Sequence, residues 1–506
     1  MRTNKRYRYL VLALLAPVAG STVLSGYASA YETFQGPTEL IYFDTEQAAP
    51  GYLLLPSWPR HEDYEYTYLL NLDGEVVHMW KTVPPEYEGR GFVLEKTARL
   101  TEKGTIVQGL STAGHTTEGE RVLLELDWDG NVAWSFTDPR EGYLYHHNFK
   151  RIWNNHLNDW TIIFTSMFPM TQEQAVAAGA DPSVQWEASP DGVVEVDMDG
   201  NIVWEWWSLD HVIQDMNPDW PNYGVLAENP GRFDLNWGPG LSGDFTHQNA
   251  LDYHREKDQI VLNNDRMGEI YVIDHGGTFV AGDFEASKAL AAGPAGDIIH
   301  RWGNPALYDS GEAPSYNPDG DATSEGDRLL FHHHDIQWIK DGLPGAGNFL
   351  IFDNGSRRAG AYYSVLLEVN PYDGAYPDAP YLSEVDAGGP ANQIVWSFRA
   401  VHANSFYSEN ISGVQRLANG NTLGIAGRQG HVFQVTPEGE VVWEYINPVM
   451  SSVPDGAVPS EVYRKVMTDK DDNRIFTAHW IAPDHPGLVG RELTPMGKIT
   501  DIMLGD

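Results

Sequence analysis

The chain of 506 residues contains no cysteine. Disulfide bonds, thiolate metal sites, iron–sulfur clusters, c-type haem attachment and cysteine nucleophiles are therefore excluded. Positive charge is also scarce, since 33 Lys and Arg residues stand against 71 Asp and Glu residues and give a formal net charge of -38 at pH 7. We expect no nucleic-acid partner, because binding to phosphate backbones requires a positive surface.

A hydrophobic run of membrane-spanning length is missing too. Residues 1–30 contain four basic residues, an apolar run from Tyr9 to Val18, and the small residues Ala28-Ser29-Ala30. This order is typical of a secretory signal peptide, and the apolar run is shorter than the ~20 residues of a spanning helix. We predict cleavage after Ala30 and a mature protein without a membrane span, either periplasmic or secreted. A membrane anchor is the alternative interpretation.

Aromatic residues, by contrast, are abundant and recur in a repeated motif. Each copy has a hydrophobic strand, a turn, and a second strand with large side chains two positions apart; the copies end at Trp80, Phe136, Trp206, Trp302, Phe398 and Tyr445. Residues two apart share one face of a strand. Asp-Gly and Glu-Gly pairs in four copies suit two-residue hairpin turns. Each copy therefore predicts a β-hairpin whose aromatic residues pack between neighbouring units.

A second hairpin pattern precedes most of these copies, at residues 97–110, 147–166, 247–266, 334–355 and 412–427. Two hairpins give four antiparallel strands, and about six such units predict an all-β fold, a β-propeller of six four-stranded blades. Seven blades stay open, because residues 490–503 also resemble a hairpin. We expect residues 31–64 to form a small N-terminal β extension, residues 65–506 to form the propeller, and the C-terminal segment to help close the ring.

Histidines and arginines are placed to meet at one mouth of the central channel. In a propeller the first strand of each blade lines the channel, and its start lies on the same face as the loop between the second and third strands. Strand starts supply His147, His247 and His334, and the loops supply Arg266, Arg357, Arg358, Arg428 and His431. Guanidinium groups suit oxyanions, and histidine can transfer protons or act as a nucleophile. The pattern predicts an anion-binding site.

A metal site is the competing interpretation of the histidines, since neutral imidazoles bind Zn or Cu. No His-Glu-x-x-His motif occurs, His332, His333 and His334 alternate in direction on a strand, and the arginines would repel a cation. A quinone cofactor has only the repeated tryptophans in its favour. We therefore predict no metal and no other cofactor.

Three pairs of motifs resemble the arylsulfotransferase (aryl-sulfate sulfotransferase) family over most of residues 65–450: THQNALDY with IVLNNDRMGEIYVID, HDIQWI with NFLIFDNGSRR, and SGVQRLANGNTL with VFQVTPEGEVVWEYINP. The resemblance implies an exported six-bladed propeller that moves a sulfuryl group from a phenolic sulfate ester to a phenol. It also implies a sulfated histidine and no nucleotide sulfate donor. By the same resemblance, His247, His334 and Arg358 hold the sulfuryl oxygens in the active site.

The carrier histidine of the family lies later in the chain, where this sequence offers His431 in a second-to-third-strand loop and His402 before a strand start. If neither is the carrier, the protein binds its anion without transferring it, or hydrolyses it. Further alternatives are a non-catalytic exported scaffold and a propeller enzyme with a metal or quinone. The candidate substrate-binding residues are His147, His402, Arg266, Arg357 and Arg428. The expected partners are an aryl sulfate and a phenol, and a homodimer is a possible assembly.

Overall fold

The computed structural model describes residues 35–505 apart from 113–118, 185, 187–188, 238–245, 318–320, 372–392, 403–405 and 469. The predicted signal peptide, residues 1–30, lies outside the described residues. The described residues belong to the unit Glu32–Asp506. Among them, no helix is both long and apolar enough to cross a membrane.

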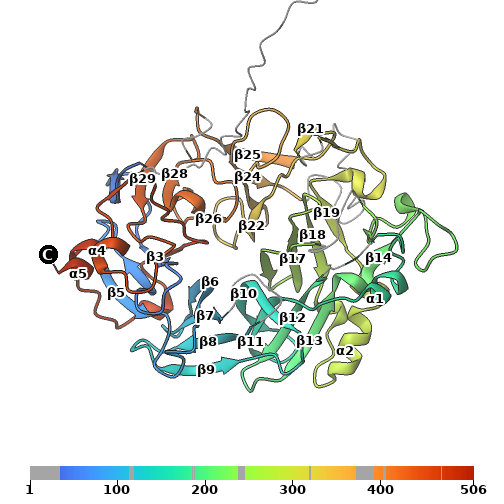
Figure 1. Cartoon of the computed structure of the whole chain (residues 1–506), viewed down its shortest axis with the longest axis horizontal. Helices are drawn as coiled ribbons and strands as arrows, with labels where there is room; N and C mark the ends of the chain where they lie inside the picture. Colours follow the sequence, from blue (N-terminus) through green and yellow to red (C-terminus); the bar gives the residue numbers. More distant parts are fainter. Residues whose placement is uncertain are drawn as a thin grey trace, which may run out of the picture. The chain divides into compact units, whose positions relative to one another are not determined.

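Six antiparallel sheets form the blades of a β-propeller, and the innermost strands surround the centre of the ring (Figure 1). Blade 1 is β31 (His479–Ile481), β3 (Tyr52–Pro56), β4 (Tyr66–Leu70) and β5 (Val76–Lys81); blade 2 is β6 (Val93–Leu100), β7 (Ile106–Ser111), β8 (Arg121–Leu126) and β9 (Val132–Phe136). Blade 3 is β10 (Leu144–Asn154), β11 (Asp159–Met167), β12 (Asp191–Asp197) and β13 (Ile202–Trp207).

Blade 4 is β16 (Leu251–His254), β17 (Gln259–Asn264), β18 (Glu269–Asp274) and β19 (His300–Trp302). Blade 5 is β22 (His334–Trp338), β23 (Phe349–Asp353), β24 (Val365–Val369) and β25 (Ile394–Phe398). Blade 6 is β26 (Ser412–Arg416), β27 (Thr422–Ala426), β28 (His431–Val435) and β29 (Val441–Ile446), with β2 (Glu39–Phe43) added at its outer edge. The prediction of an all-β, six-bladed propeller is confirmed.

Short elements decorate the blades. They are the helices α1 (Gln172–Ala177), α2 (Phe284–Ala291), α4 (Pro459–Val462) and α5 (Ile499–Leu504), and the strand pairs β1 (Gly36–Pro37) with β30 (Val466–Met467), β14 (Val212–Ile213) with β15 (Phe233–Asp234), and β20 (Ser315–Tyr316) with β21 (Ala322–Ser324). The longest of these helices, α2, packs against β13 at the outside of blade 3.

Blade 1 closes the ring by joining the two ends of the chain. Its innermost strand β31 comes from the C-terminal segment and pairs antiparallel with β3, with Tyr52 opposite Ile481 and Leu54 opposite His479. The other three strands come from the N-terminal part of the chain. The C-terminal segment thus helps to close the ring, as expected from the sequence.

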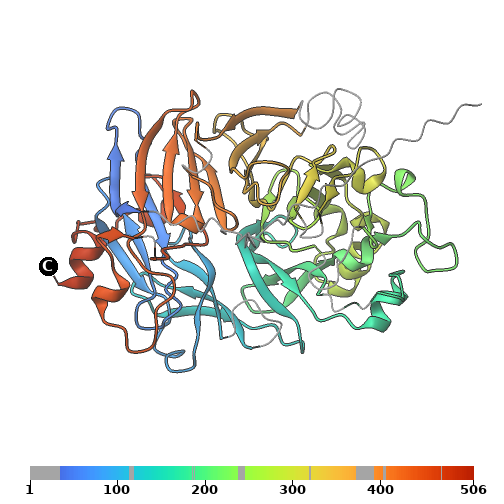
Figure 2. The ribbon, with the colours of Figure 1, turned by 45° about the horizontal axis from the view of Figure 1, so that its top comes forward.

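Two boundaries expected from the sequence are wrong. The propeller begins before residue 65, because the buried apolar strand β3 is part of blade 1, and only β1 and β2 remain as an extension. Figure 2 shows β2, in blue, beside the orange sheet of blade 6. Residues 490–503 form no seventh hairpin either: Met496 and Gly497 hydrogen-bond to the backbone of Val76, and the helix α5 then begins.

Tryptophans on outermost strands connect neighbouring blades. The indole Nε1 of Trp80 donates to the carbonyl of Asp127 in blade 2, and that of Trp443 in blade 6 donates to Leu72 in blade 1. Both side chains are fully buried. Packing between blades is therefore the role of the repeated aromatics, as predicted, and the indole N–H adds a directional bond to a large apolar contact.

The starts of the innermost strands are irregular. Register shifts interrupt the pairing between Leu94 and Ala98, between Tyr145 and Phe149, and between His334 and Ile336. Such bulges turn side chains out of the regular alternation and are common beside active sites. These bulges change the directions in which side chains point at the channel mouth.

Candidate active site

Histidines from three consecutive blades meet at the starts of β10, β16 and β22. The rings of His147 and His247 are 5.0 Å apart, centroid to centroid. Phe476, which precedes β31, lies 5.8 Å from His147 and 6.2 Å from His334. The structure thus brings together His147, His247 and His334, which we name with Phe476 the mouth cluster.

The backbone at this mouth is strained in a repeated way. His147, His247 and His332 have φ angles of 54°, 49° and 56°, and Ile411 before β26 has 47°. Residues other than glycine occupy this left-handed region at a cost of about 1–3 kcal/mol, and such residues concentrate at functional sites. Four neighbouring blades therefore share one costly conformation at the place where they contribute to the mouth.

Hydrogen bonds fix the tautomer of His334, which is buried. Its Nδ1 lies 2.9 Å from Oδ1 of Asn354, and the Asn354 amide nitrogen donates to the carbonyl of Ser408 at 2.7 Å. Oδ1 of Asn354 is therefore an acceptor, so Nδ1 of His334 must carry the proton. Burial, aided by the charge of His332, lowers the pKa of His334 to about 3. His334 is neutral at physiological pH, and its Nε2 keeps a lone pair.

Asp265 supplies negative charge beside the cluster. Its carboxylate lies 2.8 Å from Nδ1 of His332. Burial favours the neutral acid, but His332, His247 and His334 together hold the pKa of Asp265 well below its usual range. Asp265 is therefore an anion that can balance positive charge developing on the histidines.

Asp191, at the start of β12, ties two of the histidine segments together. Its Oδ2 accepts hydrogen bonds from the Gln248 backbone and the Thr246 hydroxyl, on either side of His247. Its Oδ1 lies 2.9 Å from Nε2 of His146, whose Nδ1 lies 2.7 Å from Nδ1 of His147. We did not predict this residue from the sequence, which offers only an Asp-Gly pair there.

Lys96 of β6 is a second residue that the sequence analysis missed. Its Nζ lies 5.0 Å from the ring centre of Trp58 and 5.4 Å from that of Phe476. Burial lowers the pKa of Lys96 to about 7; Glu95 opposes the shift and several arginines add to it. A lysine with such a pKa can give up and take back a proton near neutrality. The signal in the sequence that could have identified Lys96 is its position near the start of a first strand, which the histidines share.

Arg358 is buried in blade 5. It forms a hydrogen-bonded ion pair with Asp353, and its guanidinium lies 5.2 Å from the ring centre of Phe331 and 4.2 Å from that of Tyr363. Burial raises the pKa of Asp353 to about 6, although Arg358 opposes that shift. The buried Nε of Arg358 has no hydrogen-bond partner among the described residues and is available to an oxyanion.

His431 lies apart from the mouth cluster. Its Nε2 is 2.9 Å from Oε1 of Glu444, and its ring centroid lies 5.0 Å from that of Phe433, with the two rings tilted by 42°. As the first residue of β28, it faces a diagonal neighbour on β29, one strand further from the channel than β27.

The remaining predicted residues lie around the loops. Arg266, Arg357 and His402 are exposed. Arg428 is mostly buried, with Nε 3.6 Å from Oε1 of Glu409. In the part of the chain that the structure describes, convergence is seen for the histidines at the strand starts and not for the arginines as one group.

One group of described residues has the spacing of metal ligands: His156, Asp258 and His275. His275 is buried and contacts two carboxylates, with Nδ1 2.6 Å from Asp258 and Nε2 2.8 Å from Glu195. Burial disfavours its charge, but the carboxylates raise the pKa of His275 to about 9. Both nitrogens then carry protons, and the ring has no lone pair for a metal. This group fits a structural ion network.

Several solved structures share low similarity with the chain. A protein of unknown function from Bacteroides caccae is 12% identical, with 86% of this chain and 99% of that chain covered and a TM-score of 0.38. A periplasmic gluconolactonase from Pseudomonas aeruginosa is 12% identical, with coverage of 85% and 99% and a TM-score of 0.36. These likenesses are too weak to support an argument about function.

The comparison with protein families is more informative. No curated protein matches the chain. The family model described as Arylsulfotransferase (ASST) matches residues 52–453, from β3 of blade 1 into the segment after blade 6. That range includes all six blades apart from the closing strand β31 and the added outer strand β2. The chain therefore belongs to the arylsulfotransferase family.

Proposed function

We propose that the protein transfers a sulfuryl group from a phenolic sulfate ester to a phenol, and that His334 carries the group between them. Family membership supports sulfuryl transfer as the reaction class. The observation that carries the mechanism is the neutral His334, whose Nδ1–H is held by Asn354 and whose Nε2 keeps a lone pair.

The first half-reaction breaks the ester. Nε2 of His334 attacks the sulfur, a nitrogen–sulfur bond forms, and the sulfur–oxygen bond to the aryl group breaks. The bond electrons leave with the phenolate oxygen, which takes a proton from the ammonium group of Lys96. Oδ1 of Asn354 accepts a hydrogen bond from Nδ1–H of the sulfated ring. Asp265 lies near the positive charge that the ring acquires.

The second half-reaction reverses these events on the acceptor. The neutral amine of Lys96 takes the phenol proton as the phenol oxygen attacks sulfur, and the nitrogen–sulfur bond breaks to restore His334. Trp58 and Phe476 offer aromatic surfaces beside Lys96 for the ring of the donor or the acceptor. His247 and His147 supply further polar atoms for the sulfuryl oxygens.

The test is turnover of 4-nitrophenyl sulfate by purified protein, with and without phenol. We expect phenol to accelerate release of 4-nitrophenol, and His334→Ala to abolish it. His431→Ala is the matched control, because that histidine is also buried but pairs with Glu444, and it should keep most of the activity. Loss of transfer in His431→Ala with retention in His334→Ala would contradict the assignment of the carrier.

An anion-binding propeller without transfer is the second candidate. It is favoured by the positions of His431 and His402, since neither of these later histidines joins the mouth cluster. Under this alternative, aryl sulfates bind and no phenol is released over a wide panel of donors.

Export is proposed on the sequence of residues 1–30. Secretion of the full chain from a bacterial host, followed by N-terminal sequencing, should give a mature chain that begins at Tyr31. Retention of Met1 on a membrane-bound product would favour the anchor instead. The homodimer stays a prediction, which sedimentation of the purified protein would test.

A further inference from the structure

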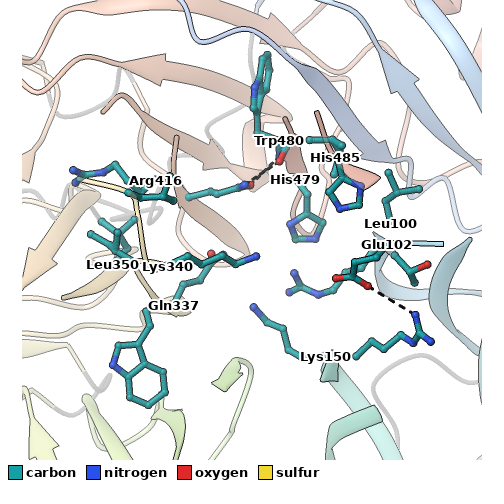
Figure 3. Close-up of a pocket in the computed structure, with 18 of the residues that line it drawn as sticks. Leu100, Glu102, Lys150, Gln337, Lys340, Leu350, Arg416, His479, Trp480 and His485 are labelled. Atoms are coloured by element: carbon teal, nitrogen blue, oxygen red, sulfur yellow. Dashed lines mark hydrogen bonds and ion pairs between the residues drawn. The ribbon is translucent and has the colours of Figure 1, made fainter. Parts of the chain in front are cut away.

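A pocket opens in the channel, on the far side from the mouth cluster. It is a cavity of about 210 Å³ between the innermost strands and the turns that follow them (Figure 3). Its walls include Arg99 of β6, Arg151 of β10 and Trp338 of β22. These residues come three or four positions after Lys96, His147 and His334 on the same strands, which corresponds to about 10–13 Å along a strand.

The pocket is strongly cationic in a chain whose net charge is -38. One acidic residue, Glu102, lines it beside five basic residues: Arg99, Lys150, Arg151, Lys340 and Arg416. Figure 3 shows the ends of Lys150 and Lys340 facing the open centre. A positive lining inside an acidic protein attracts anions selectively.

Partners outside the pocket neutralise part of this charge. Lys150 lies 3.0 Å from Asp252, and Arg416 lies 2.5 Å from Glu368. Asp335 adds negative charge near Arg99 and Lys150. Arg99 and Lys340 have no carboxylate at ion-pair distance in the described part of the chain, and Arg151 has one long ion pair, 3.8 Å from Glu102.

Hydrogen-bond donors in the lining lack acceptors. The side chain of Arg151 is 5% exposed, and none of its three guanidinium nitrogens has a hydrogen-bond partner among the described residues. Its guanidinium carbon lies 4.6 Å from the ring centre of Trp160, a contact that uses none of these hydrogen-bond donors. The Nε atoms of Arg99 and Arg416 are also buried without a partner in the described chain. Buried donors of this kind are costly unless an acceptor reaches them.

His479 of β31 responds to the same positive charge. It lines the pocket, with Nε2 3.1 Å from the Thr97 hydroxyl. Burial, together with Arg99, Lys150 and Lys340, pushes the pKa of His479 well below its usual value. An anion in the pocket would relieve the repulsion among these cations.

We propose that this pocket binds a small oxyanion with at least two negative charges, independently of the mouth cluster. The ligand needs several oxygens, because a guanidinium edge is best satisfied by two acceptor atoms at once and Lys340 approaches from another blade. A sulfate or a pyrophosphate meets this description, whereas a chloride ion does not.

Titration calorimetry and thermal unfolding with sodium sulfate and sodium pyrophosphate test the proposal, with sodium chloride at the same ionic strength as the reference. The full chain and its His334→Ala variant should each bind pyrophosphate saturably at this site and unfold at a higher temperature. Arg151→Gln and Lys340→Gln, both made in the His334→Ala background, should weaken that binding at least tenfold and at least threefold. Lys470→Gln, an exposed lysine outside the pocket, should bind like the parent.

Two results would overturn the proposal. An equal rise in unfolding temperature with chloride would mean general screening of charge. Pyrophosphate binding that is lost in His334→Ala, or that stays unchanged when Arg151→Gln or Lys340→Gln is added to that variant, would place the anion outside this pocket. If Arg151→Gln fails to fold, the binding measured for Lys340→Gln tests the proposal by itself. The Lys340 side chain is exposed, so its replacement leaves the core intact.

Discussion

His334 and Asn354 form a hydrogen bond of 2.9 Å between Nδ1 and Oδ1, across the first and second strands of blade 5. The bond fixes which nitrogen of His334 is free to react. Because Asn354 is anchored to Ser408 in turn, the side chain cannot simply flip to offer a donor.

The first prediction concerns Asn354→Asp. A carboxylate at this position favours the charged imidazole and raises the pKa of His334 from its value of about 3. Since the proposed reaction needs a neutral ring, activity at pH 5 should fall by about two- to tenfold relative to the wild type at the same pH, with the two proteins converging at pH 8. The measurement is a pH–rate profile with 4-nitrophenyl sulfate.

Ser412→Ala is the matched control for that profile. The Ser412 hydroxyl donates a long bond of 3.3 Å to the same oxygen of Asn354 and carries no charge. Its removal should leave the acid limb unchanged. If the acidic side of the pH–rate profile moves equally in both variants, disturbed packing and not charge explains the effect.

The second prediction separates a proton-transfer role of Lys96 from a structural one. Lys96→Met should slow transfer from phenyl sulfate, a donor with a poor leaving group, by about 100-fold, the usual range for a lost acid or base. It should slow transfer from 4-nitrophenyl sulfate much less, because that phenolate leaves without help. Comparing kcat for the two donors provides the test, and equal losses for both would contradict the role.

The third prediction follows from the ion network around His275. The pKa of His275 is raised from 6.5 to about 9 in the folded protein. The resulting stabilisation is complete below pH 6.5 and is lost as pH rises through about 9, and a shift of this size corresponds to about 3 kcal/mol. Thermal unfolding between pH 6 and pH 10 should therefore show a drop in the wild type. His275→Gln should be less stable at pH 6 and lack that drop.

The fourth prediction concerns the contact that joins blade 6 to blade 1. Trp443→Phe removes the bond from the indole to the Leu72 carbonyl and should cost about 1 kcal/mol of unfolding free energy. Trp443→Ala also empties a fully buried site and should cost about 3–5 kcal/mol. Denaturant unfolding measures both. A cost for Trp443→Phe as large as that for Trp443→Ala would mean that packing is not the main contribution.

Local patterns made the propeller predictable. Paired turns and aromatics two residues apart identify hairpins within short windows, and their repetition gives the blade count. The strand β3 was missed because its neighbour β31 lies more than 400 residues further along the chain, and no local pattern records such a pairing. Its continuous apolar run, Leu53 to Leu55, was the available signal.

The candidate site was predictable where position along a strand decides it. His147, His247 and His334 share a strand-start position, and the structure brings them together. Lys96 was not predicted as a site residue, because its burial depends on Trp58 and Phe476, which are remote in sequence. The contact of His431 with Glu444 was not predictable, because topology gives the face of a blade and not the partner of a side chain on it.

The closing strand has a consequence for the timing of synthesis. Phe476, which touches two histidines of the mouth cluster, reaches its place on the same segment that supplies β31. A nascent or C-terminally clipped chain that lacks this segment has five complete blades, an open edge on β3, and a mouth without its aromatic partner. Completion of the polypeptide and assembly of the site are therefore one event, and a truncated product that escapes degradation should be inactive and prone to pair through its open edge.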